Sequence, residues 1–243
     1  MLDTETKVKL KDRLYPAADQ VTFSPVFGAL EQSMYPGARV LDAGCGKGSW
    51  VLRGYRQSIG LLVGIDSEVL YQRNIDKFIV GDLERLPIKD STFDIIICYF
   101  VIEHLKNPKK VFAEFQRVLT EGGKIMFKTP CAASPMFVLS RYVPHQWQRI
   151  IKKAMQGTQE SDIFPTYYRC NTQKKLDHAL KRTGFQRVIL KGIEQIYDYL
   201  TFSRSFYAIG LLTSRLMQFL PWTEPFRSQI IGVYCKPRNS TET

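Results

Sequence analysis

The sequence has little of what would place a chain across a membrane or in an oxidising compartment. No uninterrupted apolar run reaches the ~18 residues that a bilayer-spanning helix needs. The first 20 residues are charged and lack the apolar core of a secretion signal. The five cysteines, an odd number, show no paired spacing typical of zinc or redox sites. These absences predict a cytoplasmic protein.

Acidic residues are scarce in the second half of the chain, whose charge is therefore strongly positive. The net charge of the whole chain is +11. Residues 1–130 hold 18 basic and 16 acidic side chains, whereas residues 131–243 hold 16 basic and seven acidic ones. This bias favours a negatively charged partner, which could be anionic lipid headgroups, an anionic substrate or nucleic acid. The alternative is that the charge only keeps the protein in solution.

Length, composition and the alternation of elements indicate one α/β domain with additions. The chain has 243 residues, of which 44% are apolar. Strands that alternate with helices imply a parallel sheet with right-handed crossovers. After a first strand near residue 40, the pattern predicts strands at 60–66, 78–80, 93–98, 124–128, 186–190 and 230–235. It predicts helical stretches at 8–14, 24–30, 108–119 and 171–182, and a further helix that begins around residues 49–52.

The most informative stretch is the apolar run 40–43, which contains Asp42 and leads into a glycine loop. Glycine at positions 44, 46 and 48 permits positive φ angles and leaves no Cβ between the chain and a ligand. A tight turn at the carboxyl end of a strand is where open α/β sheets bind nucleotides. The glycine spacing matches neither the dinucleotide pattern nor a phosphate-binding P-loop.

Two further acidic residues follow at strand ends. Asp66 ends the strand 60–66, 22 residues after Gly44, and about 20 residues is the separation at which a carboxylate accepts hydrogen bonds from a ribose. Asp82 follows the strand 78–80 through Gly81. Either acid alone could be an ordinary turn or capping residue. Both together, in register with the glycine loop, favour a nucleoside-containing ligand.

These segments resemble the class I S-adenosylmethionine-dependent methyltransferases, and the quinone-biosynthesis or type 11 group in particular. The resemblance covers residues 38–130 and rests on five motifs in order: LDAGCGKG, GID, GDLERLP, FDIIICYFVIEHL and LTEGGKIMF. It implies a three-layer Rossmann-like α/β fold with a seven-stranded, mostly parallel sheet. The seventh strand would be antiparallel and lie between the fifth and sixth. N-terminal helices and two insertions would complete the fold.

The resemblance also implies a site for S-adenosylmethionine. Its residues would be Asp42, Gly44, Cys45, Gly46, Gly48, Asp66, Asp82, Leu83 and Tyr99. The glycine loop would pass under the methionine part, Asp66 would hold the ribose hydroxyls, and Asp82 and the Leu83 backbone would meet the adenine. Tyr99 would lie near the sulfonium, since a cation suits an aromatic face.

Residues outside this core indicate where the methyl acceptor binds. We expect N-terminal cap helices over residues 1–36, the cofactor-binding core over 37–130, and insertions over 131–170 and 194–227. The second insertion is rich in apolar and aromatic residues, with arginines at positions 204, 215 and 227. It resembles an element that lies at an anionic membrane surface, with its arginines on phosphates, although a packing or dimerisation helix pair is the alternative.

Candidates for catalysis and acceptor binding are few. His104 lies just after the fourth strand and His145 lies in the first insertion, and either imidazole could remove a proton from an acceptor hydroxyl. Their structural alternatives are a residue that supports the cofactor loop and a surface residue, respectively. We predict no metal, because Phe100 stands where some quinone methyltransferases carry a ligand glutamate. Tyr15, Tyr167, Tyr168 and Arg169 are the candidate acceptor contacts.

The sequence thus favours methyl transfer to oxygen or carbon of a small hydrophobic or lipid-linked, quinone-like acceptor. The apolar second insertion favours this hypothesis and a peripheral position at the inner membrane surface. The basic second half favours an alternative, a nucleic-acid methyltransferase, although no Asn/Asp-Pro-Pro-aromatic motif follows the fourth strand. A non-catalytic cofactor-binding partner is the third hypothesis, and homodimerisation is open.

Overall fold

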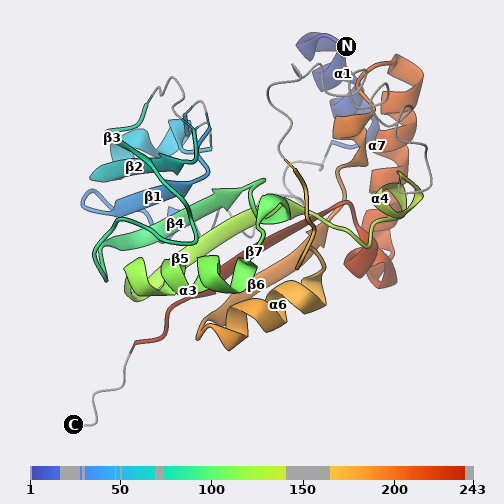
Figure 1. Ribbon diagram of the computed structural model, residues 1–243. Helices are drawn as coiled ribbons and strands as arrows, with labels where there is room; N and C mark the ends of the chain where they lie inside the picture. Colours follow the sequence, from blue (N-terminus) through green and yellow to red (C-terminus); the bar gives the residue numbers. More distant parts are fainter. Residues whose placement is uncertain are drawn as a thin grey trace.

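A seven-stranded sheet forms the centre of the molecule (Figure 1). The computed structural model describes residues 2–16, 28, 31–46, 48–49, 51–68, 74–140 and 165–238. The strands are β1 (Arg39–Ala43), β2 (Leu61–Asp66), β3 (Lys77–Val80), β4 (Phe93–Tyr99), β5 (Leu119–Pro130), β6 (Gln186–Ile193) and β7 (Gln229–Cys235). The α-helices are α1 (Thr4–Leu14), α3 (Pro108–Val118), α4 (Pro135–Ser140), α6 (Gln173–Arg182) and α7 (Arg204–Phe219), and the 3-10 helices are η1 (Arg53–Ser58), η2 (Ile102–His104), η4 (Ile196–Tyr199) and η5 (Pro221–Phe226).

The strand order is β3-β2-β1-β4-β5-β7-β6. β1 pairs in parallel with β2 and β4, β2 with β3, and β4 with β5. β7 runs antiparallel between β5 and β6, which confirms the predicted class I methyltransferase sheet. Because β1 to β4 are parallel, the residues that follow each of them meet at one edge of the sheet. This carboxyl edge carries all the acids of the predicted cofactor site.

Apolar side chains cover both faces of the sheet. On one face α3 turns four buried residues, Val111, Phe112, Phe115 and Val118, toward the strands. Their spacing of one and three places them on a single side of a helix. α6 lies beside α3 (Figure 1) and is capped by Thr172, whose hydroxyl accepts from the Lys175 backbone N–H. Both helices agree with the sequence prediction to within two residues.

The helix predicted to begin around residues 49–52 is a 3-10 helix and not an α-helix where the chain is described. Residues 51–52 form a turn and the 3-10 helix η1 follows over residues 53–58. Twelve residues separate Gly48 from β2, and Gly54 within this segment weakens α-helix formation. β5 is also longer than predicted, since it begins at Leu119 directly after α3. The predicted helix at 24–30 lies outside the described residues, apart from Gly28.

The insertion 194–227 forms η4, α7 and η5, and α1 packs against α7 (Figure 1). Tyr15, Tyr197, Tyr207 and Leu211 form the buried centre of this group. Arg227, which we expected to face phosphates, is instead 7% exposed. Its guanidinium donates to the carbonyls of Met217 and Gln218 at the end of α7 and to that of Gly192. Arg227 therefore caps α7, because the last carbonyls of a helix have no partner within the helix.

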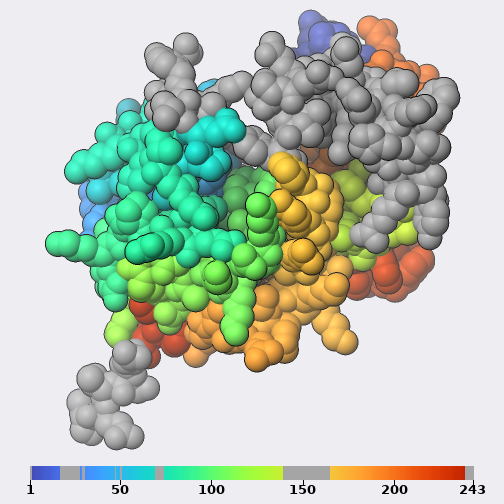
Figure 2. All heavy atoms as spheres, viewed as in Figure 1, coloured from blue at the N-terminus to red at the C-terminus, as the bar shows by residue number. Residues whose placement is uncertain are grey.

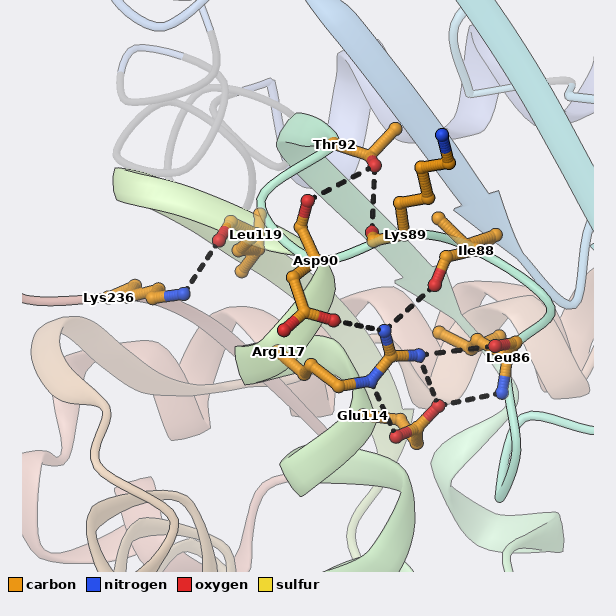
Figure 3. Close-up of polar contacts among 9 residues, drawn as sticks. All are labelled: Leu86, Ile88, Lys89, Asp90, Thr92, Glu114, Arg117, Leu119 and Lys236. Carbon is orange, nitrogen blue, oxygen red and sulfur yellow. Dashed lines mark hydrogen bonds and ion pairs between the residues drawn. The ribbon is translucent and has the colours of Figure 1, made fainter.

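Arg117 of α3 fastens the segment between β3 and β4 to the body of the protein (Figure 3). Its guanidinium binds Glu114 in a bidentate ion pair, with N–O distances of 2.9 and 2.7 Å. It also donates to the Asp90 carboxylate at 2.6 Å and to the carbonyls of Ile88 and Leu86 at 2.8 and 3.1 Å. Glu114 in turn accepts from the Leu86 backbone N–H at 2.8 Å. One side chain thus holds a loop that lacks regular secondary structure.

We expect Arg117→Ala to lower the free energy of unfolding by about 1–3 kcal/mol, because it leaves Glu114 and two loop carbonyls without their charged donor. Lys110→Ala is the matched control on the same helix. Its ammonium lies 3.7 Å from Glu84 and the side chain is 69% exposed, so we expect a change below about 0.5 kcal/mol. Urea unfolding of both variants measures this, and equal effects would contradict a fastening role for Arg117.

Candidate functional site

The glycine loop is held by the neighbouring strand. The backbone N–H groups of Gly44 and Cys45 both donate to the Ile65 carbonyl of β2, at 2.8 and 3.2 Å. Gly44 has a φ of +76°, and a Cβ at this position would collide with the Val101 side chain. Glycine is therefore required at position 44 by both backbone conformation and packing.

Asp66 is bound to the same loop. Its Oδ2 accepts from the Gly46 backbone N–H at 2.9 Å, and its Oδ1 accepts from the Ser67 N–H at 2.7 Å. The Ser67 hydroxyl also donates to Oδ1, at 3.4 Å, whereas Oδ2 has only the Gly46 donor among the described residues and can still accept from a hydroxyl group. Gly46 has a φ of +52°, and a Cβ there would meet no atom of the described residues within 4 Å. The loop thus offers an open space beside a fixed carboxylate.

The side chains of Asp42 and Cys45 point into the protein. Asp42 is 6% exposed, and burial raises the pKa of its carboxyl from 3.8 to about 6. Burial also raises the pKa of the Cys45 thiol to about 12, so the thiol stays protonated. The Cys45 sulfur lies against Gly64 of β2, close to the place where a Cβ on that residue would be. Position 45 can therefore meet a ligand only through its backbone.

Asp82 and Leu83 begin the loop that Arg117 fastens. The Gly81 N–H donates to the Asp66 carbonyl at 2.9 Å, so this turn starts beside the end of β2. The Asp82 Oδ1 accepts from the Glu84 N–H at 2.9 Å, which fixes the carboxylate. A shallow surface hollow lies on the side of this loop next to α3, and its lining residues are Gly81, Arg85, Leu86, Pro87, Ile88, Lys89 and Arg117. Because Arg117 is already bonded to this loop, we assign the hollow no ligand.

Tyr99 ends β4 and the chain then turns sharply. Phe100 has a φ of +56°, a conformation that costs free energy for a bulky residue. Its N–H donates to the Lys128 carbonyl at 2.8 Å, which ties the turn to β5. Burial raises the pKa of the Tyr99 hydroxyl well above its usual value, so this side chain stays neutral. The strained turn places two aromatic residues at the carboxyl edge.

Segment 165–168 lies against η2. The N–H groups of Tyr167 and Tyr168 donate to the Glu103 carbonyl at 2.7 and 3.1 Å, and the His104 Nδ1–H donates to the Pro165 carbonyl at 2.9 Å. In Figure 2 the yellow segment that starts at residue 165 borders the green residues that follow β4. The hydrogen bond assigns Nδ1 of His104 as the donor, which leaves Nε2 as the basic nitrogen of a neutral ring.

The remaining predicted residues are spread out. Arg169 is exposed beside this segment. Tyr15 is 4% exposed in the cluster of α1, η4 and α7, and its buried hydroxyl has no hydrogen-bond partner among the described residues. His145 lies outside the described residues. Within the described part of the chain, no three His, Cys, Asp or Glu side chains gather in a way that could hold a metal ion.

The comparisons with known proteins agree with this geometry. Residues 41–127 match the family described as "Methyltransferase domain". A malonyl-[acyl-carrier protein] O-methyltransferase of Serratia marcescens is 33% identical over 107 residues, which are 42% of this chain and 42% of the relative. The matched region thus spans less than half the length of that relative.

Solved structures resemble the chain over most of its length. The [4+2]-cyclase SpnF has a TM-score of 0.55 at 17% identity and covers 94% of this chain and 81% of its own. A geranyl diphosphate C-methyltransferase of Streptomyces coelicolor has a TM-score of 0.54 at 14% identity and covers 96% and 85%. At these identities the likeness shows the fold, which the strand order already indicates. Residues 41–127 therefore resemble a methyltransferase domain, and the sheet that contains them has the class I strand order.

The described residues fit the cofactor S-adenosylmethionine. The space beside Gly46 would admit the methionine part close to the backbone. The Asp66 carboxylate lies beside that space and suits the ribose hydroxyls, which are neutral donors. Asp82 follows β3 at the same edge and suits the adenine amino group. Each of these acids is already held in place by backbone N–H groups or by burial. Cofactor binding therefore has few side chains left to order.

The sequence pattern did not reveal two buried titratable residues near this edge of the sheet. Lys128 of β5 is 4% exposed, its ammonium donates to Gln195 Oε1 at 2.7 Å, and it lies 5.2 Å from the Phe100 ring centroid. Burial lowers the pKa of Lys128 from 10.5 to about 8. Because Tyr99 and Lys128 are register partners in adjacent strands, both lie where β4 and β5 end. The only sequence signal is a lysine within the apolar run Ile-Met-Phe-Lys-Thr-Pro.

Glu103, the second missed residue, is buried on the opposite side of β5. It is 4% exposed, and its Oε2 accepts from the Thr129 hydroxyl at 2.9 Å. Thr129 in turn accepts from the Asn171 Nδ2 at 2.6 Å. Burial raises the pKa of Glu103 from 4.5 to about 7. The sequence placed Glu103 next to His104 but did not reveal that it would be buried.

We predict that alanine substitutions at Gly44 and Gly46 have different effects. Gly44→Ala should lower the free energy of unfolding by at least about 2 kcal/mol, since it combines positive φ with a collision with Val101. Gly46→Ala should cost only about 1 kcal/mol but weaken binding of S-adenosylhomocysteine, because its methyl group enters the open space. Urea unfolding and calorimetric titration separate the two effects. Wild-type affinity in Gly46→Ala would show that the cofactor does not pass over the loop.

We also predict a pH-dependent stability term from Glu103. Its folded pKa is raised from 4.5 to about 7, so its contribution is fully present below pH 4.5 and is lost as the pH rises through 7. The full shift corresponds to about 3 kcal/mol at 1.36 kcal/mol per pKa unit. Glu103→Gln should therefore be more stable relative to wild type at pH 8 than at pH 5, measured by urea unfolding. The exposed Glu121→Gln control should show no such difference.

Proposed function

We propose that this methyltransferase transfers the methyl group of S-adenosylmethionine to an oxygen or carbon atom of a small hydrophobic or lipid-linked acceptor. The single observation that carries the proposal is the aromatic lining of the carboxyl edge beyond the cofactor loop. There the Phe137 ring lies 6.2 Å from that of Tyr168 and 5.9 Å from that of Tyr199. Tyr99 and Phe100 end the adjacent strand. An acceptor enclosed by so many rings is favoured if it is apolar or planar.

The cofactor supplies an electrophilic methyl group on a sulfonium. The new bond forms between this carbon and the acceptor atom, the carbon–sulfur bond breaks, and its electron pair stays on sulfur. The protein's main contribution to such an in-line displacement is to position the acceptor and to exclude water. The half-buried and strained turn at Tyr99 and Phe100 provides a surface for both tasks.

A hydroxyl or enol acceptor must also lose its proton. His104 can accept it at Nε2, because its Nδ1–H is held by the Pro165 carbonyl. Lys128 is the second candidate, since its lowered pKa of about 8 makes a neutral amine accessible near neutral pH. As an ammonium, Lys128 would instead stabilise the negative charge of an acceptor oxygen. Either role explains why a lysine is held where β4 and β5 end.

The comparisons support an acceptor of this class without naming it. The Serratia marcescens relative is, by name, an O-methyltransferase of a malonyl group on a carrier protein. The Streptomyces coelicolor enzyme was solved with geranyl diphosphate, so an apolar chain can be bound on this fold. SpnF, a cyclase by name, has the same fold, and for this reason the fold does not determine the reaction.

The experiment is a transfer assay with methyl-labelled S-adenosylmethionine and a lysate of the source organism. Asp66→Asn is the control, because it should weaken cofactor binding by about 10- to 100-fold through loss of charge-assisted hydrogen bonds. We expect label in the organic-soluble fraction, absent with Asp66→Asn. Label in nucleic acid would overturn the proposal in favour of the nucleic-acid alternative. No label in any fraction, with cofactor binding intact by calorimetry, would overturn it in favour of a non-catalytic partner.

A further inference from the structure

Exposed apolar side chains are concentrated in one short part of the chain. Thirteen large apolar residues are exposed in the part of the protein that the structure describes. Eight of these lie between positions 202 and 226: Phe202, Phe206, Ile209, Leu212, Leu216, Phe219, Trp222 and Phe226. The most exposed are Phe219 and Trp222, at 72% each. A contiguous patch of this kind marks an interaction surface.

The patch exists because α7 is apolar on two sides. One side, with Tyr207, Gly210, Leu211 and Ser214, is buried against the body of the protein. A Cβ at Gly210 would lie 2.9 Å from the Tyr197 Cα, so the helix packs closely on η4. The exposed residues recur every three or four positions and form a stripe along the other side. Since the buried side is held by close packing, the stripe cannot turn inward.

Aromatic residues stand at both ends of the stripe. Phe202 precedes α7 and its ring centroid lies 5.1 Å from that of Phe206. Trp222 and Phe226 follow the helix within η5. Aromatic side chains at the ends of an apolar stripe are typical of elements that lie in the boundary between lipid headgroups and acyl chains.

Basic side chains outnumber acidic ones around the stripe, and the one acid between Phe202 and Phe226, Glu224, accepts from the Gly192 backbone N–H. No acidic residue occurs from Tyr199 to Thr223, whereas Arg204 and Arg215 are both exposed there. α1 lies alongside α7 (Figure 1) and carries four basic and two acidic side chains. Two copies joined through this stripe would bring like charges together. An anionic lipid surface would instead complement both the apolar stripe and the cations beside it.

α7 has the length and the shape of a surface helix. Its 16 residues span about 24 Å at 1.5 Å per residue, and one side is occupied by protein. Among the described helices none is long and apolar enough to cross a bilayer. A helix with these properties can lie parallel to a membrane with only its outer stripe immersed.

We propose that the α7 stripe, with Phe202, Trp222 and Phe226 at its ends, is a docking surface for anionic lipid bilayers. The inference rests on exposure, packing and charge, and it holds for any methyl acceptor. It would also bring the aromatic carboxyl edge near lipid, because η4 of the same insertion contributes Tyr199 to that edge.

The test is co-sedimentation with vesicles of phosphatidylcholine that contain phosphatidylglycerol, compared with pure phosphatidylcholine. We expect wild-type protein to bind the anionic vesicles and to bind less as salt rises. L216E/F219E should bind at least about tenfold more weakly, since two carboxylates enter the stripe. Val188→Glu is the matched control: this valine is 48% exposed on β6, away from the stripe, so its binding should stay at the wild-type level.

Two further measurements distinguish a loss of vesicle binding from misfolding of the variant. Fluorescence at Trp222 should shift to the blue with anionic vesicles, and the shift should be lost in Trp222→Phe, which leaves two of the three tryptophans in place. Calorimetric binding of S-adenosylhomocysteine should be unchanged in L216E/F219E, which separates this proposal from the methyl-transfer proposal. Absence of wild-type binding at low salt would overturn the docking surface. So would equal binding by L216E/F219E, or a dimer by analytical ultracentrifugation that this variant abolishes.

Discussion

The structure depends on the pair of hydrogen bonds that the Ile65 carbonyl accepts from Gly44 and Cys45. They tie the end of β1 to the end of β2, and they force the loop into a conformation that only glycine adopts easily at position 44. The same constraint brings the Gly46 N–H to Asp66 and directs the Cys45 side chain toward Gly64. The geometry of the cofactor site therefore follows from the hydrogen bonds that join the ends of the parallel strands β1 and β2.

The two halves of the site are built by different means. The cofactor half uses strand ends and backbone N–H groups, so its carboxylates are fixed before any ligand binds. The proposed acceptor half uses segments from distant parts of the chain, namely η2, residues 165–168 and η4. Glu103 joins them, since its carbonyl holds Tyr167 and Tyr168 while its side chain is bonded to Thr129 of β5.

The insertion that forms α7 is attached to the sheet by buried polar groups. The Glu194 carboxylate accepts from the N–H groups of Ile196 and Ser228, and Arg227 caps α7. Buried polar groups need partners, so these bonds specify one orientation for the helix. Because these bonds and the packing on η4 fix the buried side of α7, its apolar stripe remains on the outside.

The sequence by itself determined the strands, the glycine loop and the positions of Asp66 and Asp82, because strand periodicity and turn chemistry are local. The place and direction of the seventh strand followed only from the family resemblance. The sequence also indicated α3 and α6, whose apolar spacing and caps lie within the helices themselves. Only the tertiary structure decided that η1 is not an α-helix, that Arg227 is buried, and that Lys128 and Glu103 are charged groups removed from water. Burial and pKa depend on neighbours that are distant along the chain, such as Gln195 for Lys128, and no local pattern specifies them.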